Sequence, residues 1–151
     1  MGKNHSIRPT FLLFKIALLL FLFFGCRPNE VNKKVLKSSY IAINGSDTAW
    51  LNVVINESSF KGQCEINFHN RYTDSGDVKG MIKGDTLLGD FHYLHYGLEW
   101  KRIAIALLRK NNKIIMGESK QEVYLNIPFF KPENPINYDS VKFVFHKISN
   151  R

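Results

Sequence analysis

The chain has 151 residues, a formal net charge of +8 at pH 7 and 44% hydrophobic residues. This length suits a single domain after an export leader, and only two cysteines exclude a scaffold built on several disulfides. The basic residues are dispersed as single residues or pairs such as Lys33 and Lys34. Because no basic helix or nucleic-acid motif is present in the sequence, we expect no nucleic-acid partner.

The first residues have the pattern of an export signal. Lys3 and Arg8 precede an apolar run over residues 11–25, and Cys26 follows the run. A basic start, an apolar region and a small residue at the cleavage site define such a signal. A membrane-spanning helix needs ~20 apolar residues, whereas this run is shorter and is interrupted by Lys15.

The ending Phe23-Phe24-Gly25-Cys26 resembles the lipobox of bacterial lipoproteins, although Phe23 stands where Leu, Val or Ile is common. The resemblance implies cleavage before Cys26, diacylglycerol on its thiol and an acyl group such as palmitate on the new amino group. We therefore expect a signal peptide over residues 1–25, a lipidated polar tether over residues 26–38 and one domain over residues 39–151. A secreted protein and an uncleaved anchor are the alternatives.

The residues after Cys26 give an expectation of where in the cell the protein is located. Arg27-Pro28-Asn29-Glu30 contains no acidic cluster of the kind that accompanies display on the outer face in some lipoproteins. We expect attachment to the outer membrane of a bacterial cell envelope, with the domain facing the periplasm. Secretion is the alternative location.

From residue 39 onward the hydrophobic period is two, which is typical of strands with one buried face. In the clearest strand Phe60, Cys64 and Ile66 alternate with polar residues, so Cys64 is expected to point inward. Residues 103–108 are apolar on both faces, which predicts a cover on the outside of that strand. The sequence predicts about eight strands, near residues 39–43, 48–55, 60–69, 77–83, 86–95, 99–109, 113–124 and 140–148.

Turn residues separate these segments. Gly, Asn and Asp gather at residues 44–47, 74–77, 83–85 and 110–113, and these residues tolerate the positive φ of hairpin turns. Consecutive strands should therefore pair antiparallel. An all-β antiparallel meander buries its apolar face by curling into a small barrel or half-barrel, and interior glycines fit tight curvature; these are Gly62, Gly80, Gly89 and Gly117.

In its hairpin rhythm and its stretch Gly76-Asp-Val-Lys-Gly80-Met-Ile-Lys-Gly84, the domain resembles lipocalin- and avidin-like barrels and small lipoproteins of unknown function. These resemblances imply no active-site residue in this chain. Residues 126–139 break the pattern with three prolines around Phe129 and Phe130. We expect a loop there whose paired aromatics plug one end of the barrel, with contact to a partner as the alternative.

The sequence contains no convincing catalytic or metal-binding pattern. His92 and His95 are three apart on a strand and should point to opposite faces, and Asp74 and Asp77 flank a predicted turn without a full calcium loop. Phosphate-loop, Gly-x-Ser-x-Gly and His-Glu-x-x-His motifs are absent from the sequence. We expect no catalytic residues, no metal and no cofactor, and we expect that the protein is not an enzyme.

Two functions fit this pattern. The favoured one is a lipid-anchored, non-catalytic module that binds an envelope protein through its surface, because bulky inward residues can fill an eight-stranded barrel. The alternative is a small apolar ligand inside a hollow barrel, as in lipocalins. In that case Phe91, Tyr93 and Trp100 are the candidate wall residues.

Overall fold

The computed structural model describes Gly2 and residues 36–148. Apart from Gly2, the predicted signal peptide lies outside these residues, as does Cys26. No helix in the part described is long and apolar enough to cross a membrane. The strands are β1 (Leu36–Asn44), β2 (Asp47–Ile55), β3 (Ser59–Phe68), β4 (Tyr72–Lys83), β5 (Thr86–His95), β6 (Glu99–Lys110), β7 (Lys113–Gly117), β8 (Gln121–Tyr124), β9 (Ile127–Phe130) and β10 (Val144–Lys147).

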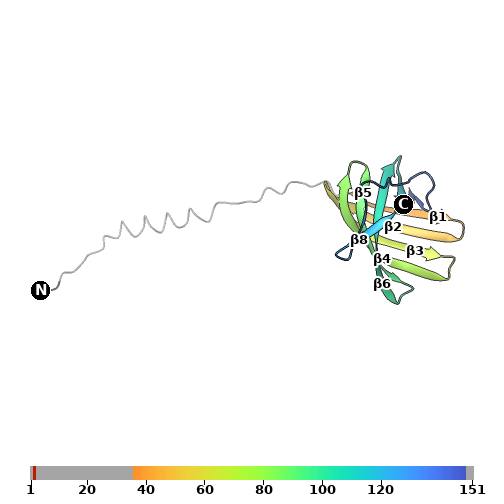
Figure 1. Ribbon diagram of the computed structural model, residues 1–151, viewed down its shortest axis with the longest axis horizontal. Helices are drawn as coiled ribbons and strands as arrows, with labels where there is room; N and C mark the ends of the chain where they lie inside the picture. The colour runs from red at the N-terminus through yellow and green to blue at the C-terminus, as the bar shows by residue number, and fades with distance from the viewer. Residues whose placement is uncertain (1, 3–35, 149–151) are drawn as a thin grey trace. The chain divides into compact units, whose positions relative to one another are not determined.

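Eight strands close into an antiparallel barrel in the order β1-β10-β7-β6-β5-β4-β3-β2 (Figure 1). Strands β1 to β7 pair consecutively as a meander. Strand β10 pairs with β7 and β1 and closes the ring. β8 and β9 form a separate hairpin. The structure thus confirms the predicted all-β, eight-stranded antiparallel barrel.

The inside of the barrel is occupied by one apolar core. Alternation places Phe60, Cys64 and Ile66 of β3 inward and buried, as predicted, and burial raises the pKa of the Cys64 thiol to about 12. The largest fully buried side chains are Phe91 and Phe145. Because this core is drawn from residues 42–145, the domain needs nothing from the preceding segment to bury its apolar face, and we expect it to fold alone.

Two interior glycines face each other where β4 and β5 approach closely. Gly80 pairs with Gly89, and a Cβ added to Gly80 would lie 2.1 Å from the Leu88 carbonyl oxygen. A Cβ on Gly89 would lie 1.9 Å from the Lys79 carbonyl oxygen. Since no side chain fits at those distances, the glycines permit the strand bending that a small barrel needs.

The β3–β4 turn is displaced from its predicted position. Residues 74–77 were expected to form it, but they lie inside β4, and the chain turns at residues 69–71. His69 and Asn70 take φ values of 54° and 55° there, a region that Asn and His enter more readily than most residues. The prediction that Asp74 and Asp77 flank a turn is therefore wrong, and Asp74 points into the barrel end.

The C-terminal third also departs from the prediction. The expected strand over residues 113–124 divides into β7 and β8, and the expected loop over residues 126–139 contains β9. β9 packs against β6 and β5, and it brings Phe129 and Phe130 to the outer wall. The paired aromatics thus cover the side of the barrel and do not plug its end.

Candidate functional site

A hollow of about 920 Å³ lies on the outside of the barrel. One wall consists of outward-facing residues of β4, β5 and β6, including Met81, Leu88 and Ala104. The other wall is β9 and the proline-rich segment after it, including Phe129 and Ile136. We call this hollow the outer groove. Its volume and mainly apolar lining are in the range of ligand-binding pockets in proteins.

The side chain of Gln121 holds the β8–β9 hairpin to the barrel. β7 pairs with β6 only from Ala106 onward, which leaves the backbone of Ala104 without a strand partner on that side. The Ala104 N–H donates to the Gln121 Oε1 at 2.8 Å, and the Gln121 Nε2 donates to the Ala104 carbonyl at 3.2 Å. The amide of Gln121 thus satisfies a strand edge that would otherwise be unpaired.

The segment after β9 docks on the outer wall at Gly117. A Cβ at Gly117 would lie 2.4 Å from the Tyr138 ring and 2.5 Å from the Ile136 side chain. This glycine therefore makes room for the covering segment, whereas the sequence had suggested a role in curvature. Burial there raises the pKa of Tyr138. Ala104 and Ala106 are buried although they face outward, which confirms the predicted cover on this strand.

Charged groups lie on the floor and rim of the outer groove. Lys79 and Lys83 line it together with Asp90. The Asp90 Oδ2 is buried and has no hydrogen-bond partner among the described residues. The Arg102 Nε lies 3.6 Å from that oxygen, too far for a hydrogen bond but close enough for an ion pair. The Asp90 Oδ2 therefore keeps hydrogen-bonding capacity that the described residues do not use.

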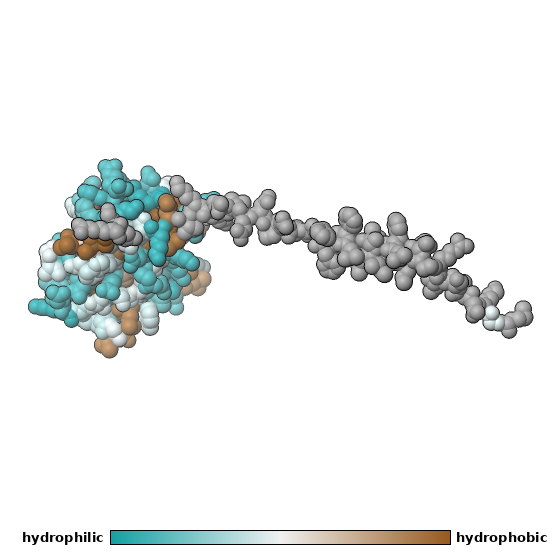
Figure 2. Space-filling view, turned by 180° about the vertical axis from the view of Figure 1, so that it is seen from behind, coloured by the Kyte–Doolittle hydropathy of each residue, from teal (hydrophilic) through white to brown (hydrophobic). Residues whose placement is uncertain are grey.

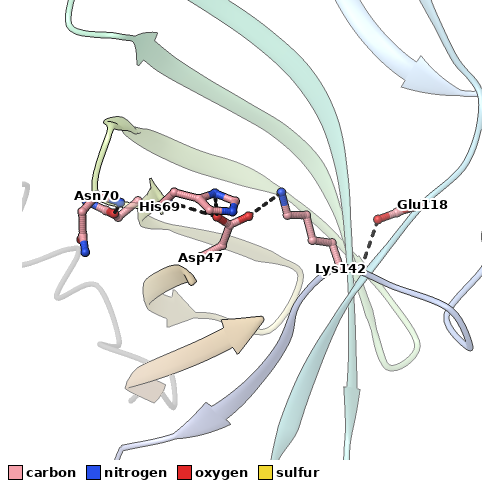
Figure 3. Close-up of polar contacts among 6 residues, drawn as sticks. Asp47, His69, Asn70, Glu118 and Lys142 are labelled. Atoms are coloured by element: carbon pink, nitrogen blue, oxygen red, sulfur yellow. Dashed lines mark hydrogen bonds and ion pairs between the residues drawn. The ribbon is translucent and has the colours of Figure 1, made fainter. Parts of the chain in front are cut away.

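A second polar cluster lies at the barrel end that carries the β1–β2, β3–β4 and β5–β6 turns, which we call the polar end. There Asp47 is buried between a histidine and a lysine (Figure 3). Its carboxylate lies 2.7 Å from the His69 Nδ1 and 2.8 Å from the Lys142 Nζ. The hydrogen bond from Lys142 holds the pKa of Asp47 below its usual value, although burial opposes this shift.

This cluster joins parts of the chain that are far apart in sequence. The backbone N–H of Lys142 donates to the Glu118 carboxylate at 3.2 Å, and the Lys142 side chain contacts Asp47 (Figure 3). The segment before β10 is therefore held both to the residue that follows β7 and to the first residue of β2. The Lys142 Nζ also lies 4.6 Å from the centre of the Phe68 ring, a cation–π contact. These contacts hold the short closing strand β10 in place.

The buried Asp74 and the half-buried His95 form another pair at the polar end. The His95 Nδ1 lies 2.7 Å from the Asp74 carboxylate, and the Tyr96 ring packs edge-on against the imidazole. Tyr72 stacks on Tyr96 with ring centres 4.0 Å apart, and burial is the main cause of the raised pKa of Tyr72. A carboxylate in this position fixes the orientation of an imidazole. In the residues that the structure covers, no three His, Cys, Asp or Glu side chains converge as a metal site.

The three candidate ligand residues are not brought together. Phe91 and Tyr93 lie inside the barrel, stacked with ring centres 4.6 Å apart, and burial raises the pKa of Tyr93. Trp100 is 61% exposed on the outer face, where its ring packs 4.7 Å from His92. His92 and His95 occupy opposite faces of β5, as predicted.

Sequence reasoning missed the outer groove and the Asp47 cluster. Both depend on contacts between segments that do not follow one another in the sequence, and neither has a local motif. The Asp74–His95 pair had a usable signal, because the alternation at Val78 and Gly76 extends back to Asp74 on the inward face. The pair was missed because a turn was predicted at residues 74–77.

Comparisons with known proteins gave no relative. No protein-family model matches the chain, and neither the curated proteins nor the solved structures contain a significant match.

Proposed function

We propose that this protein is a lipid-anchored, non-catalytic binding module of the bacterial cell envelope, and that it engages an apolar segment of a protein partner in the outer groove. The observation that carries this proposal is the contrast between the two sides of the barrel wall. The interior holds a continuous apolar core, while the outside carries a hollow of about 920 Å³ with mainly apolar walls.

The outer groove suits a peptide segment for two reasons. Its walls present Met81, Leu88 and Phe129, whose burial by a partner would be favourable at roughly 25 cal/mol per Å² of apolar surface. Its floor presents the Asp90 side chain, which is 16% exposed and can accept a hydrogen bond from a backbone N–H of a bound segment. A protein held at a membrane by a tether also meets its neighbours at a raised effective concentration.

Lipidation of Cys26 is the second part of the proposal and rests on the leader that precedes it. Cells fed labelled palmitate are expected to incorporate label into the wild-type protein and not into Cys26→Ser. Label that persists at the normal level in Cys26→Ser would contradict lipidation at this residue.

Photo-crosslinking in intact cells tests the groove. A photoreactive phenylalanine replaces Met81, which is 57% exposed and lines the groove, or Ile43, which is 70% exposed and lies elsewhere. We expect a discrete protein adduct from position 81 that is absent from position 43. The same adducts from both positions, or none from position 81, would argue against a partner in the groove.

A small apolar ligand in the same groove is the second candidate, because the volume and lining also suit a small molecule. It differs from the barrel-interior version of this function, in which a ligand would have to displace the stacked Phe91 and Tyr93. Co-purification of an extractable apolar compound that Met81→Trp excludes, without a protein adduct at position 81, would favour this candidate.

A further inference from the structure

The tip of the β8–β9 hairpin, residues 123–127, projects apolar side chains into solvent. Val123, Tyr124, Leu125 and Ile127 are 67%, 70%, 79% and 57% exposed, and the fifth residue, Asn126, is uncharged. We call these five residues the apolar tip. On the face that Figure 2 presents, apolar surface is confined to a few patches within a largely hydrophilic surface. Such a concentration of exposed apolar residues indicates a contact surface.

Leu125 takes an unfavourable backbone conformation in the apolar tip. The two central turn residues, Leu125 and Asn126, take φ values of 48° and 62°. Turns of this kind favour Asn or Gly at both positions, and a leucine with positive φ is strained. Because most of its side chain is in solvent, Leu125 gains little from packing within the domain. Strain that folding does not explain points to a functional role.

A cationic hollow of about 530 Å³ lies beside the apolar tip. The side chains of Trp100 and Arg102 line it together with Leu125, and no acidic side chain among the described residues does. Lys101 and Arg102 lie 3.3 Å and 3.6 Å from carboxylates of Glu99 and Asp90. Lys101 is opposite the buried Tyr93 of β5, so its side chain lies on the inner face of β6. Arg102 lies on the outer face opposite His92 and meets Asp90 through its Nε, so its other N–H groups can bind an anion in the hollow.

We propose that the apolar tip and this hollow form a docking site for a bilayer with anionic phospholipid headgroups. The tip enters the boundary between headgroups and acyl chains, and the indole of Trp100 lies at headgroup level, where such rings are enriched. Arg102 binds a lipid phosphate in the hollow. Apolar residues flanked by a cation and an aromatic ring match a membrane surface in both polarity and charge. This contact is additional to the lipid proposed on Cys26, and it does not depend on that lipid.

The test uses residues 27–151, which lack the leader and Cys26, with Trp50→Phe so that Trp100 is the remaining tryptophan. Vesicles contain either phosphatidylcholine alone or an equal mixture with phosphatidylglycerol. We expect co-sedimentation with the anionic vesicles and a blue shift of the Trp100 emission on binding. Arg102→Gln should weaken binding about fivefold, because one surface charge contributes ~1 kcal/mol.

Leu125→Gly separates docking from folding. Glycine accepts the positive φ, so this variant should be at least as stable as its parent, yet it should bind anionic vesicles at least about tenfold more weakly. Ile43→Asn, which removes an exposed apolar residue elsewhere, should bind like the parent. Unchanged binding by Leu125→Gly, equal loss in Ile43→Asn, or no binding of the parent to anionic vesicles would overturn the proposal, and the last result would point to a protein partner at the tip.

Discussion

The environment of Phe91 makes it a core residue. Its ring is 1% exposed and stacks on Tyr93. We expect Phe91→Ala to lower the free energy of unfolding by ~3–5 kcal/mol, because it removes a buried ring and leaves a cavity. Urea denaturation of residues 27–151 measures this change. Trp100→Ala, at an exposed position, should change the free energy of unfolding by only about 0.5 kcal/mol. A larger loss of stability in Trp100→Ala than in Phe91→Ala would contradict the placement of Phe91 in the core and Trp100 on the surface.

Asp47 should make the stability of the domain depend on pH in the acid range. Its pKa is lowered in the folded state, chiefly by Lys142, and an unfolded aspartate titrates near ~3.9. The carboxylate therefore stabilises the fold fully above that unfolded pKa, and the contribution is lost as the pH falls through the folded pKa. Urea denaturation between pH 7 and pH 3 should show this loss.

Two variants isolate the contribution of Asp47. Asp47→Asn cannot titrate, so its stability should fall less steeply below pH 4 than that of the wild type. Asp139→Asn removes an exposed aspartate and should keep the wild-type slope. If both variants keep that slope, Asp47 does not carry the acid sensitivity.

At the scale of elements, Gln121 is the residue that fastens the β8–β9 hairpin to β6. Gln121→Leu keeps much of the side-chain volume but leaves the Ala104 N–H and carbonyl unpaired, so we expect a cost of ~1–3 kcal/mol. Hydrogen exchange of the Ala104 amide should accelerate more than global unfolding accounts for. Lys120→Ala, at an exposed neighbour, serves as the control; unchanged exchange at Ala104 in Gln121→Leu would show that the amide does not hold the hairpin.

The strands that alternation predicted well are those whose pattern is local. β2, β3 and β5 begin and end within a residue of their predicted bounds, because inward and outward residues differ at each step. The turn predicted at residues 74–77 was wrong because Gly76 and the flanking Asp residues are typical of turns. In the barrel, a Cβ on Gly76 would lie 2.1 Å from the His92 carbonyl oxygen, so this glycine serves close strand approach.

Most of the candidate site could not be predicted from the sequence. Residues 103–108 predicted a cover on the outer wall, and that prediction is confirmed. Which segment supplies the cover depends on Gly117 and Gln121, each of which has a partner that only the fold reveals. The same holds for Asp47 and Lys142, which meet because barrel closure brings the first hairpin beside the last strand.

At the scale of the whole molecule, the two sides of the barrel wall differ, because the inner side holds the apolar core and the outer side holds the groove. The interior core closes the fold, so that changes there act on stability. The outer groove and the apolar tip both depend on the β8–β9 hairpin, which lies outside the barrel and can vary without disturbing the core. We infer that binding specificity resides in this hairpin and in the segment after it.

Methyl-resolved NMR of residues 27–151, titrated with the neutral apolar probe N-phenyl-1-naphthylamine, tests most directly which side of the wall binds. The reporters are Met81 and Leu88 in the outer groove, and Val53 and Leu107 in the interior. We expect saturable shifts at Met81 and Leu88, with Val53 and Leu107 unchanged, and loss of the response in Met81→Trp. Shifts centred on Val53 and Leu107 that persist in Met81→Trp would contradict binding on the outer wall and place the ligand inside the barrel.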